Sequence, residues 1–466
     1  MKRTPFTIAG AALVIAALGA QQPAAPAPQQ PAAPAPQQPA ASQQPSDVTT
    51  TISSGGVGTP PRFAVPDFIA LSKDAETVDA ARTIPRVLLD DLNFEHEFAL
   101  IPRDVYATIP TATSMYDVPL DRWREVNADG VIIGTVQKVD SGVRVEVRLF
   151  NVRSGQSAFG REYSGSIANP RVYAHQFSDE VHQNQRALRG VARTKLTFNS
   201  DRDGERMSGT VERRNAKEIY IADYDGENQR RVTTGFSLNI TSTWSPDARS
   251  IAYTSYIRGL PNIFVSHIYQ GTREELTRNT GNNFLPAWSP DGTRIAFASN
   301  RDQSGNTEIY VMNADGSNVR RLTNNPAADG SPTWSPSGTQ IAFTSDRRGV
   351  PQIWIMGADG LGQQPLTSEY SDRPTWSPAP YNEIAYASRT GPGQDIKVLD
   401  LATRQVRQLT FGEGTNESPA FAPNGRHLAF MSTRSGKSQI FTIARDGKDL
   451  KQVTRMGNNY QPDWSK

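Results

Sequence analysis

The fold of this chain is decided by one stretch, Phe284-Leu285-Pro286-Ala287-Trp288-Ser289-Pro290-Asp291-Gly292-Thr293-Arg294-Ile295-Ala296-Phe297-Ala298-Ser299. Variants of it recur from about Lys195 to Lys466. In each copy an aromatic corner precedes a turn and an Ile-Ala-Phe-type strand, and then come a second strand, an Asp-Gly turn and a Leu-Thr end. The corner aromatics stand 42 to 46 residues apart, at Trp244, Trp288, Trp334, Trp376, Phe421 and Trp464. Such a period, with four short strands per unit, is typical of propeller blades.

Local patterns within the unit indicate antiparallel β structure. Pro290–Gly292 and Ala314–Gly316 are predicted hairpin turns, because Asp and Gly tolerate the positive φ that tight turns need. The short runs between them, such as Ile295–Phe297, are rich in branched and aromatic residues, as buried strands are. A single four-stranded sheet cannot bury both of its faces, so the sheets must stack around an axis, with the corner aromatics filling the wedges between neighbours.

The repeat also gives the number of blades. The Ile-Ala-Phe position occurs six times, at Leu196–Phe198, Ile251–Tyr253, Ile295–Phe297, Ile341–Phe343, Ile384–Tyr386 and Leu428–Phe430. The first copy has no corner aromatic before it, whereas the C-terminal stretch supplies a spare one, Trp464. We therefore predict an all-β six-bladed β-propeller over residues 191–466, closed by the C-terminal strand, which pairs with the strand that begins near Lys195. This closure removes an open sheet edge.

The N-terminal sixty residues carry targeting and linker signals. Residues 1–20 form a predicted signal peptide, with Lys2 and Arg3 ahead of the apolar run Phe6–Leu18, which is too short to span a bilayer. Residues 21–60 are a Pro/Ala/Gln-rich tether that ends in a flexible segment. The tether is either a plain spacer or a ligand for a proline-reading module. Within the flexible segment Val48, Thr50 and Ile52 would share one face of a strand.

Residues 61–190 are predicted to form an α/β domain. Alternating apolar positions indicate strands, and apolar positions three and four apart indicate helices. The predicted strands are Phe63–Phe68, Phe98–Ile101, Val131–Val139, Val143–Asn151 and Gln156–Tyr163. The predicted helices are Glu76–Leu92, which contains Pro85, Leu120–Ala128 and Pro170–Leu188. The last helix leads directly into the first blade, so we expect the two domains to pack together.

Composition and motifs argue against several function classes. Beyond the first twenty residues the chain has 47 Lys and Arg against 47 Asp and Glu, which argues against nucleic-acid binding through phosphates. There is no cysteine, so disulfides, zinc–thiolate sites, cysteine nucleophiles and a lipidated cysteine are excluded. The Gly-x-Ser-x-Gly elbow, the phosphate loop, the dinucleotide fingerprint and the His-Glu-x-x-His motif do not occur. We therefore expect neither an enzyme nor a cofactor.

Two patterns resemble metal sites. His175 and His182 are seven residues apart and would share a helix face, but no third ligand stands near them in sequence. The run Asn199, Asp201, Asp203 and Gly204 copies the first half of a calcium loop. Thr210 stands where that loop requires Glu, so this run is either a calcium site or a turn.

A propeller binds partners at the mouth where the loops between blades converge. Five residues before each corner stand Asn239, Asn283, Asp329, Ser371, Asn416 and Asn459, and the next residues are Ile240, Phe284, Gly330, Asp372, Glu417 and Tyr460. Six-fold pseudosymmetry would arrange them as a polar ring with Phe284 and Tyr460 as apolar anchors, which suits a protein or peptide partner. Each short polar residue alone is also explained by a turn hydrogen bond.

The order of these features resembles the TolB family of the Tol–Pal envelope system over about Asp47 to Lys466. It combines a signal segment, an α/β domain that ends in Leu188-Arg-Gly-Val-Ala-Arg-Thr-Lys-Leu-Thr-Phe198, and Pro-x-Trp-Ser-Pro-Asp-Gly repeats. The resemblance implies a monomeric, non-enzymatic periplasmic protein that serves outer-membrane constriction and integrity during cell division. It implies binding of the peptidoglycan-associated lipoprotein Pal at the mouth, through Leu238, Thr241 and Phe284. It also implies that Asp47–Gly58 contacts a TolA-type inner-membrane protein, without membrane insertion.

Two other classes of function remain open at this point. One is the propeller module of, or partner to, a prolyl-oligopeptidase-like hydrolase, which peptide or ester hydrolysis by the purified protein would support. The other is a periplasmic sensor of glycans or small ligands, for which aromatic residues at the mouth would be suitable.

Overall fold

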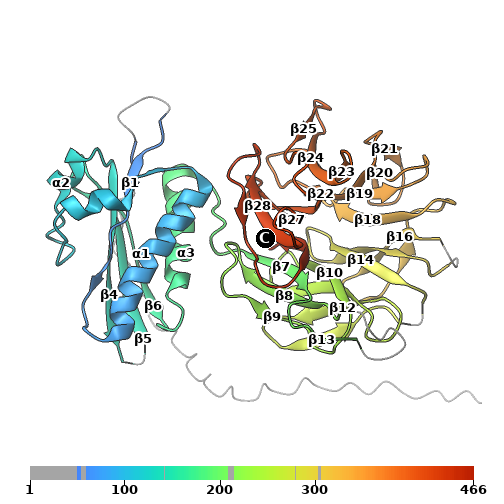
Figure 1. Cartoon of the computed structure of the whole chain (residues 1–466), viewed down its shortest axis with the longest axis horizontal. Helices are drawn as coiled ribbons and strands as arrows, with labels where there is room; N and C mark the ends of the chain where they lie inside the picture. Colours follow the sequence, from blue (N-terminus) through green and yellow to red (C-terminus); the bar gives the residue numbers. More distant parts are fainter. Residues whose placement is uncertain (1–49, 54–58, 141, 208–214, 279, 303–305) are drawn as a thin grey trace, which may run out of the picture. The chain divides into compact units, whose positions relative to one another are not determined.

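The structure is a computed structural model that describes residues 50–53, 59–140, 142–207, 215–278, 280–302 and 306–466. It consists of an N-terminal mixed α/β part followed by a six-bladed β-propeller (Figure 1), which confirms the fold class predicted from the repeat. The predicted signal peptide, most of the tether and Val48 lie outside the described residues. Among the described helices, none combines the length and the apolar character that crossing a membrane requires.

The α/β part is built on a sheet with the strand order β3-β1-β4-β5-β6, and β2 also pairs with β4. β1 is parallel to β3 and β4, and β4, β5 and β6 form the predicted antiparallel meander. The two long helices α1 and α3 lie side by side on one face of this sheet (Figure 1). The elements are β1 (Arg62–Ala64), β2 (Ile69–Ala70), α1 (Ala75–Glu95), β3 (Ala99–Leu100), the 3-10 helix η1 (Arg103–Thr108), α2 (Leu120–Glu125), β4 (Gly130–Val139), β5 (Gly142–Asn151), β6 (Ser157–Gly165) and α3 (Arg171–Arg186).

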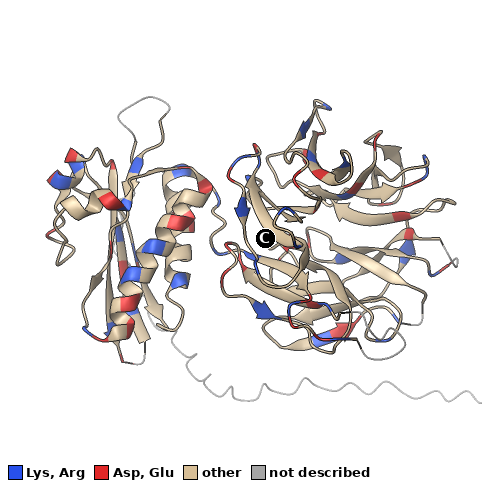
Figure 2. Cartoon of the chain, viewed as in Figure 1, with Lys and Arg blue, Asp and Glu red and all other residues tan. Residues whose placement is uncertain are grey.

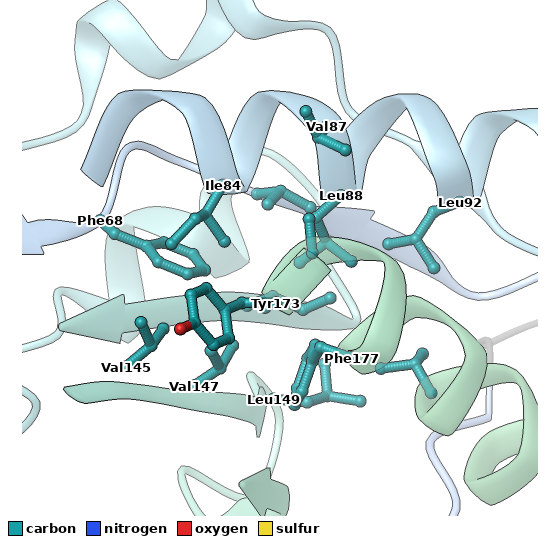
Figure 3. Packing of buried hydrophobic residues seen from close by; sticks show 14 of the residues in the cluster. Phe68, Ile84, Val87, Leu88, Leu92, Val145, Val147, Leu149, Tyr173 and Phe177 are labelled. Carbon is teal, nitrogen blue, oxygen red and sulfur yellow. The ribbon is translucent and has the colours of Figure 1, made fainter. Parts of the chain in front are cut away.

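Figure 3 shows how the sequence periodicities produce the core of this part. α1 contributes side chains four residues apart, β5 contributes alternate residues, and α3 covers them from the side. All the labelled side chains are buried. They include Ile84, Leu88 and Leu92 of α1, Val145, Val147 and Leu149 of β5, and Tyr173 and Phe177 of α3.

Pro85 lies inside α1, and the structure shows why the helix tolerates it. Proline has no N–H, so it cannot donate to the carbonyl oxygen of Ala81 four residues earlier. The backbone N–H of Phe68 donates to that oxygen instead, at 2.9 Å. Pro85 thus leaves the Ala81 carbonyl oxygen free for a hydrogen bond that holds the segment between β1 and β2 against α1.

Two predicted elements end three or more residues before their predicted C-terminal ends. The strand predicted over Phe63–Phe68 ends at Ala64, because Pro66 cannot take part in a strand ladder, although Val65 and Phe68 remain buried. The helix predicted over Leu120–Ala128 ends at Glu125, and Asn127 then adopts a left-handed φ of 56° that a helix does not allow.

The propeller is a ring of six four-stranded sheets within the described residues. The first strand of each sheet contacts the first strands of both neighbouring sheets, so these strands surround the axis. Each of them ends at a corner aromatic: β10 (Asn239–Trp244), β14 (Asn283–Trp288), β18 (Asp329–Trp334), β22 (Ser371–Trp376), β26 (Asn416–Phe421) and β30 (Asn459–Trp464).

The remaining strands follow outward in chain order. The second strands are β7 (Lys195–Ser200), β11 (Ser250–Ser255), β15 (Arg294–Ser299), β19 (Gln340–Ser345), β23 (Glu383–Arg389) and β27 (His427–Ser432). The third strands are β8 (Glu218–Asp223), β12 (Asn262–His267), β16 (Glu308–Asn313), β20 (Gln352–Gly357), β24 (Gln394–Asp400) and β28 (Gln439–Ala444). The short outer strands are β9 (Arg230–Arg231), β13 (Thr272–Glu275), β17 (Arg320–Arg321), β21 (Gln364–Pro365), β25 (Val406–Gln408) and β29 (Lys451–Gln452).

The C-terminal strand closes the ring as predicted. β30 pairs antiparallel with β7, and Trp464 lies opposite Leu196 in that register. The corner aromatics also fill the wedges between blades: Trp334 packs on Ile309 and Val311 of the preceding sheet and on Ile341 of its own. The apolar surface shared by neighbouring sheets is what holds the ring together.

Buried polar contacts join α1 and α3 to the propeller. The carboxylate of Glu95 accepts hydrogen bonds from Val191 N at 2.8 Å and from Asn424 Nδ2 at 2.9 Å, and it pairs with Arg426. The ring of His427 stacks on Phe94, with their centroids 4.1 Å apart. These contacts agree with the expectation that the two domains pack together. The proposed boundaries at residues 60 and 190 remain predictions.

Candidate partner-binding face

One face of the propeller carries the loops that lead into the first strands, and we call it the pre-corner face. It comprises the first three residues of β10, β14, β18, β22, β26 and β30 together with the residues that precede them. Charges of both signs are interspersed over the described parts of the chain (Figure 2). The character of the pre-corner face is therefore described side chain by side chain.

The first residues of these strands are buried rather than presented to solvent. The four asparagine side chains among them bond to the third strand of the preceding blade: Asn239 Nδ2, for example, donates to Glu218 at 2.8 Å, and Asn459 Nδ2 donates to Gln439 at 2.9 Å. Exposure is 0 or 1 % at all six positions, which are Asn239, Asn283, Asp329, Ser371, Asn416 and Asn459. These residues fix the loops of the pre-corner face, and a direct contact between them and a partner stays a prediction.

In four of the described blades an arginine completes this arrangement. The second strand of each of these blades ends at the serine of a Ser-x-Arg sequence. The arginine bonds the first residue of the adjacent inner strand and lies over aromatic rings of its own blade. Arg202, Arg301, Arg347 and Arg434 donate to Asn459, Asn283, Asp329 and Asn416 at 2.8, 2.9, 2.7 and 3.0 Å. Sequence reasoning missed this clamp, although the recurring Ser-x-Arg after the Ile-Ala-Phe strand was its signal.

The next two residues of each inner strand form the accessible rim. Every inner strand has a bulge between its second and fifth residues, and its third residue has a φ between 48° and 57°. These third residues are Thr241, Leu285, Ser331, Arg373, Ser418 and Gln461. Proline stands at the fourth position in five of the six strands and cannot donate to the ladder, so the sequence did contain a signal for the bulge.

The side chains at the second position divide the rim into two arcs. Ile240, Phe284 and Tyr460 stand on three consecutive blades and are half-buried, and we call them the apolar arc. Asp372 and Glu417 stand on two consecutive blades opposite, and we call them the acidic arc. Gly330 contributes no side chain between the two arcs. Sequence symmetry predicted the ring but not its division into two sides.

Local electrostatics distinguish the two arcs further. Burial raises the pKa of Glu417, Arg373 opposes that effect, and the neighbouring Asp372 adds to it. On the other side Lys217 Nζ lies 3.5 Å from the ring centroid of Tyr460, and burial lowers the pKa of this lysine. A cation over the face of an aromatic ring is a favourable contact that fixes the orientation of the ring.

Exposed apolar side chains surround the rim. Phe236 is 55 % exposed, Phe411 is 73 % exposed and Met456 is 64 % exposed. All three lie in the loops that lead from an outer strand to the next inner strand. Sequence reasoning did not select them, and their only signal was an apolar residue one to three places after the Leu-Thr end. Such side chains at a loop-lined mouth are typical of a protein-binding site.

The other predicted site residues lie as follows. Leu238 is half-buried, and its carbonyl oxygen accepts the N–H of Tyr256 at 3.0 Å. Thr241 shares a hydrogen bond of 2.7 Å with Thr254. Thr50 and Ile52 lie on the α/β part rather than on this face: Ile52 is buried there, and both residues bond to Gln185 of α3. Neither residue is in a strand here, whereas the sequence suggested a strand with these side chains on one face.

The region that resembled a calcium loop is held by protein donors. Asp201 accepts bonds from Asn458 N at 2.7 Å and from Asn458 Nδ2 at 3.0 Å, and Asp203 accepts the hydroxyl of Tyr220 at 2.7 Å. These bonds suit the turn interpretation. Thr210 lies outside the described residues. Within the part of the chain that the structure describes, no group of three His, Asp or Glu residues is arranged to hold a metal.

Comparison with protein families gives two matches. Residues 49–158 match the TolB amino-terminal domain, and residues 186–380 and 367–466 match the TolB beta propeller domain. The propeller match alone covers more than half of the chain.

Curated proteins and solved structures give concordant similarities. The chain is 34 % identical over 166 residues to the Tol-Pal system protein TolB of Desulfosudis oleivorans, which is 35 % of each chain. It is 36 % identical over 152 residues to that of Geobacter sulfurreducens, which is 33 % of this chain and 32 % of that one. These matches span about a third of the length of the curated relatives. The crystal structure of TolB from Acinetobacter baumannii covers 87 % of this chain and 97 % of its own, with a TM-score of 0.72 at 23 % identity, which supports the fold.

Proposed function

The chain belongs to the TolB family, and on that premise we propose that it is a periplasmic, non-enzymatic protein that binds the peptidoglycan-associated lipoprotein Pal at its pre-corner face. It would serve outer-membrane constriction and integrity during cell division by linking Pal to inner-membrane Tol proteins. The observation that carries the proposal is the division of the rim into an apolar arc and an acidic arc, surrounded by exposed Phe236, Phe411 and Met456.

This rim specifies the chemistry of the segment it binds. A partner would place an apolar side chain against Ile240, Phe284 and Tyr460, where burial excludes water from both surfaces. It would place a basic or hydrogen-bond-donating group toward Asp372 and Glu417, whose charges would steer its approach. The strand bulges present these side chains on a rigid ring, so little ordering of the propeller is needed when the partner binds.

Truncation of one of the two aromatic residues of the apolar arc tests the site. We expect Phe284→Ala to weaken binding of the soluble domain of Pal about tenfold or more, as loss of an aromatic anchor does. Calorimetric titration measures the affinity, and the thermal unfolding midpoint reports whether the ring is intact. The neighbouring Asn283 is unsuitable for this test because its side chain is buried and bonded to Ser299 and Arg301.

Tyr269→Ala provides the matched control for this experiment. Tyr269 is 78 % exposed and follows β12 at the opposite end of the strands. We expect its removal to leave Pal affinity unchanged. Equal affinities of the wild type, Phe284→Ala and Tyr269→Ala would refute the assignment of the pre-corner face.

The contacts of the N-terminal segment support the proposed link to inner-membrane Tol proteins. Gln185 Oε1 accepts Ile52 N at 2.8 Å, Gln185 Nε2 donates to Thr50 O at 3.0 Å, and Thr50 N donates to Ala158 O at 3.2 Å. Two of these three bonds depend on one side chain. We propose that Val48, Thr50 and Ile52 contact a TolA-type protein when this segment leaves the α/β part.

Gln185→Ala tests whether this side chain retains the segment. Loss of two hydrogen bonds of about 1 kcal/mol each should speed hydrogen exchange at the amides of Thr50 and Ile52 about tenfold or more. Gln183→Ala, at an exposed position of the same helix, is the control and should have no effect. Unchanged exchange in Gln185→Ala would mean that other contacts hold the segment.

A further inference from the structure

A cavity of about 260 Å³ lies at the other end of the propeller axis, where the inner strands finish at the corner aromatics. Two rings of equivalent residues line it. The inner ring consists of the residues just before the corners, and the cavity touches Thr243, Ala287, Thr333, Thr375 and Asp463. The outer ring consists of residues two places after the corners, namely Pro246, Pro290, Pro336, Pro378, Pro423 and Lys466. The proposed Pal site does not involve these residues.

One blade breaks the six-fold pattern of this cavity. Five blades contribute threonine or alanine to the inner ring and proline to the outer ring, whereas the blade closed by β30 contributes Asp463 and Lys466. Arg189 also lines the cavity. The charged groups of the site are therefore all on one side, next to walls of proline and aromatic rings. No ion pair within 4 Å involves Arg189 or Lys466 among the described residues.

We propose that this axial cavity binds a small organic carboxylate with an apolar body, about the size of an N-acylated amino acid. Among the lining side chains, the cationic Arg189 and Lys466 outnumber the acidic Asp463, which favours an anion over a cation. Arg189 and Lys466 would receive the carboxylate, since charge-assisted bonds to a carboxylate are among the strongest that proteins make. The apolar body would pack on Trp244, Trp464 and the proline ring. The volume excludes a folded partner and suits a ligand below the usual drug-sized range.

Asp463 couples this binding to pH. Its Oδ2 accepts the backbone N–H of Trp244 at 2.7 Å, and burial raises the pKa of this carboxyl to about 6. The other charged groups that line the cavity are Lys466 and Arg189. An anion beside Asp463 disfavours its ionised form, so binding would take up a proton. Affinity should therefore rise as pH falls through 6, by about tenfold between pH 7.5 and pH 5.

Three leucine derivatives that differ in charge test whether the cavity prefers an anion, a neutral compound or a cation. N-acetyl-L-leucine is an anion at these pH values, N-acetyl-L-leucinamide is neutral and L-leucinamide is a cation. Titration of the full chain, followed by tryptophan fluorescence and calorimetry, should give an affinity for the anion about tenfold above that for the neutral amide. Equal affinities, preference for the cation, or no measurable binding of any of the three would overturn the proposal.

Variants separate the roles of the charged residues. Arg189→Ala and Lys466→Ala should each weaken N-acetyl-L-leucine binding severalfold, and Asp463→Asn should remove the pH dependence while it keeps the hydrogen bond to Trp244 N. Lys217→Ala removes a cation from the pre-corner face and should change nothing. Wild-type affinity in both Arg189→Ala and Lys466→Ala, with unfolding midpoints also unchanged, would contradict the assignment of these residues to the carboxylate.

Discussion

Trp464→Ala is expected to lower the free energy of unfolding of the propeller by about 3 to 5 kcal/mol, as large-to-small changes at buried aromatic positions do. Trp464 is 4 % exposed and packs with Leu196 and Phe198 of β7 and with Ala222 of β8. Its Nε1 also donates to Thr194 Oγ1 at 2.7 Å. The substitution therefore creates a cavity and leaves a buried hydroxyl without its donor at the place where the two ends of the ring meet.

The position of this residue makes its effect larger than that of the other corner aromatics. β30 comes from the C-terminus, whereas its partners β7, β8 and β9 come from the start of the propeller. Loss of Trp464 weakens the pairing that closes the ring and exposes the edge of β7. Urea unfolding measures the stability, and hydrogen exchange at the amides of Leu196 and Phe198 reports the closure.

Trp376→Ala is the matched control for closure. Trp376 occupies the same corner of a blade whose four strands are consecutive in sequence, and it is also buried. We expect it to lower stability through its cavity while the amides of β7 stay protected. If the two variants expose β7 equally, or if Trp464→Ala leaves the unfolding midpoint unchanged, the C-terminal strand is not the closure that holds the ring.

The closure and the ring size were predictable from sequence because they depend on counting. Six copies of one motif with a spare corner aromatic at the C-terminus leave a single economical arrangement, and Trp464 does lie opposite Leu196. The core helices were predictable for a similar reason, since Ile84, Leu88 and Leu92 repeat at the period of a helix face.

The candidate site was only partly predictable because periodicity does not say which way a residue faces. Asn283 and Phe284 are adjacent in sequence, yet the first is buried against the preceding third strand and the second is half-exposed at the rim. The bulge after Phe284 and the clamp by Arg301 decide this difference. Both depend on contacts between strands that are neighbours in space, and a single copy of the motif does not reveal them.

The second large effect concerns pH. We expect the chain to lose about 3 kcal/mol of stability as pH rises from 6.5 to beyond 9, because of His175. This side chain is buried, with Nδ1 2.8 Å from Asp91 Oδ2 and Nε2 3.7 Å from Asp223 Oδ2. Burial disfavours its charged form, but the nearby carboxylates of Asp223 and Asp91 outweigh that effect and raise the pKa of His175 to about 9.

The sign of this effect follows from proton binding. The folded chain holds the His175 proton up to about pH 9, whereas an unfolded chain releases it near 6.5. The stabilisation is therefore complete below pH 6.5 and disappears as pH rises through 9. His427 acts in the opposite direction: burial lowers its pKa to about 3, so its contribution is complete above 6.5 and is lost as pH falls toward 3.

These two histidines together place maximum stability near pH 6.5, and single variants separate them. His175→Gln should flatten the decline of stability between pH 6.5 and 9.5 in urea unfolding, and His427→Gln should alter only the acid side.

Both rings lie where α1 and α3 meet the propeller: Asp91 also accepts the hydroxyl of Tyr224 at 2.8 Å, and the His427 ring nitrogen Nε2 lies 3.0 Å from Phe94 O. Loss of the His175 charge leaves Asp91 and Asp223 buried without their shared cation, so the α/β part should separate from the propeller before either unfolds. Hydrogen exchange at pH 9.5 would show this as faster exchange at Tyr224 than at Phe297. Equal alkaline slopes for the wild type and His175→Gln would show that this histidine does not carry the effect.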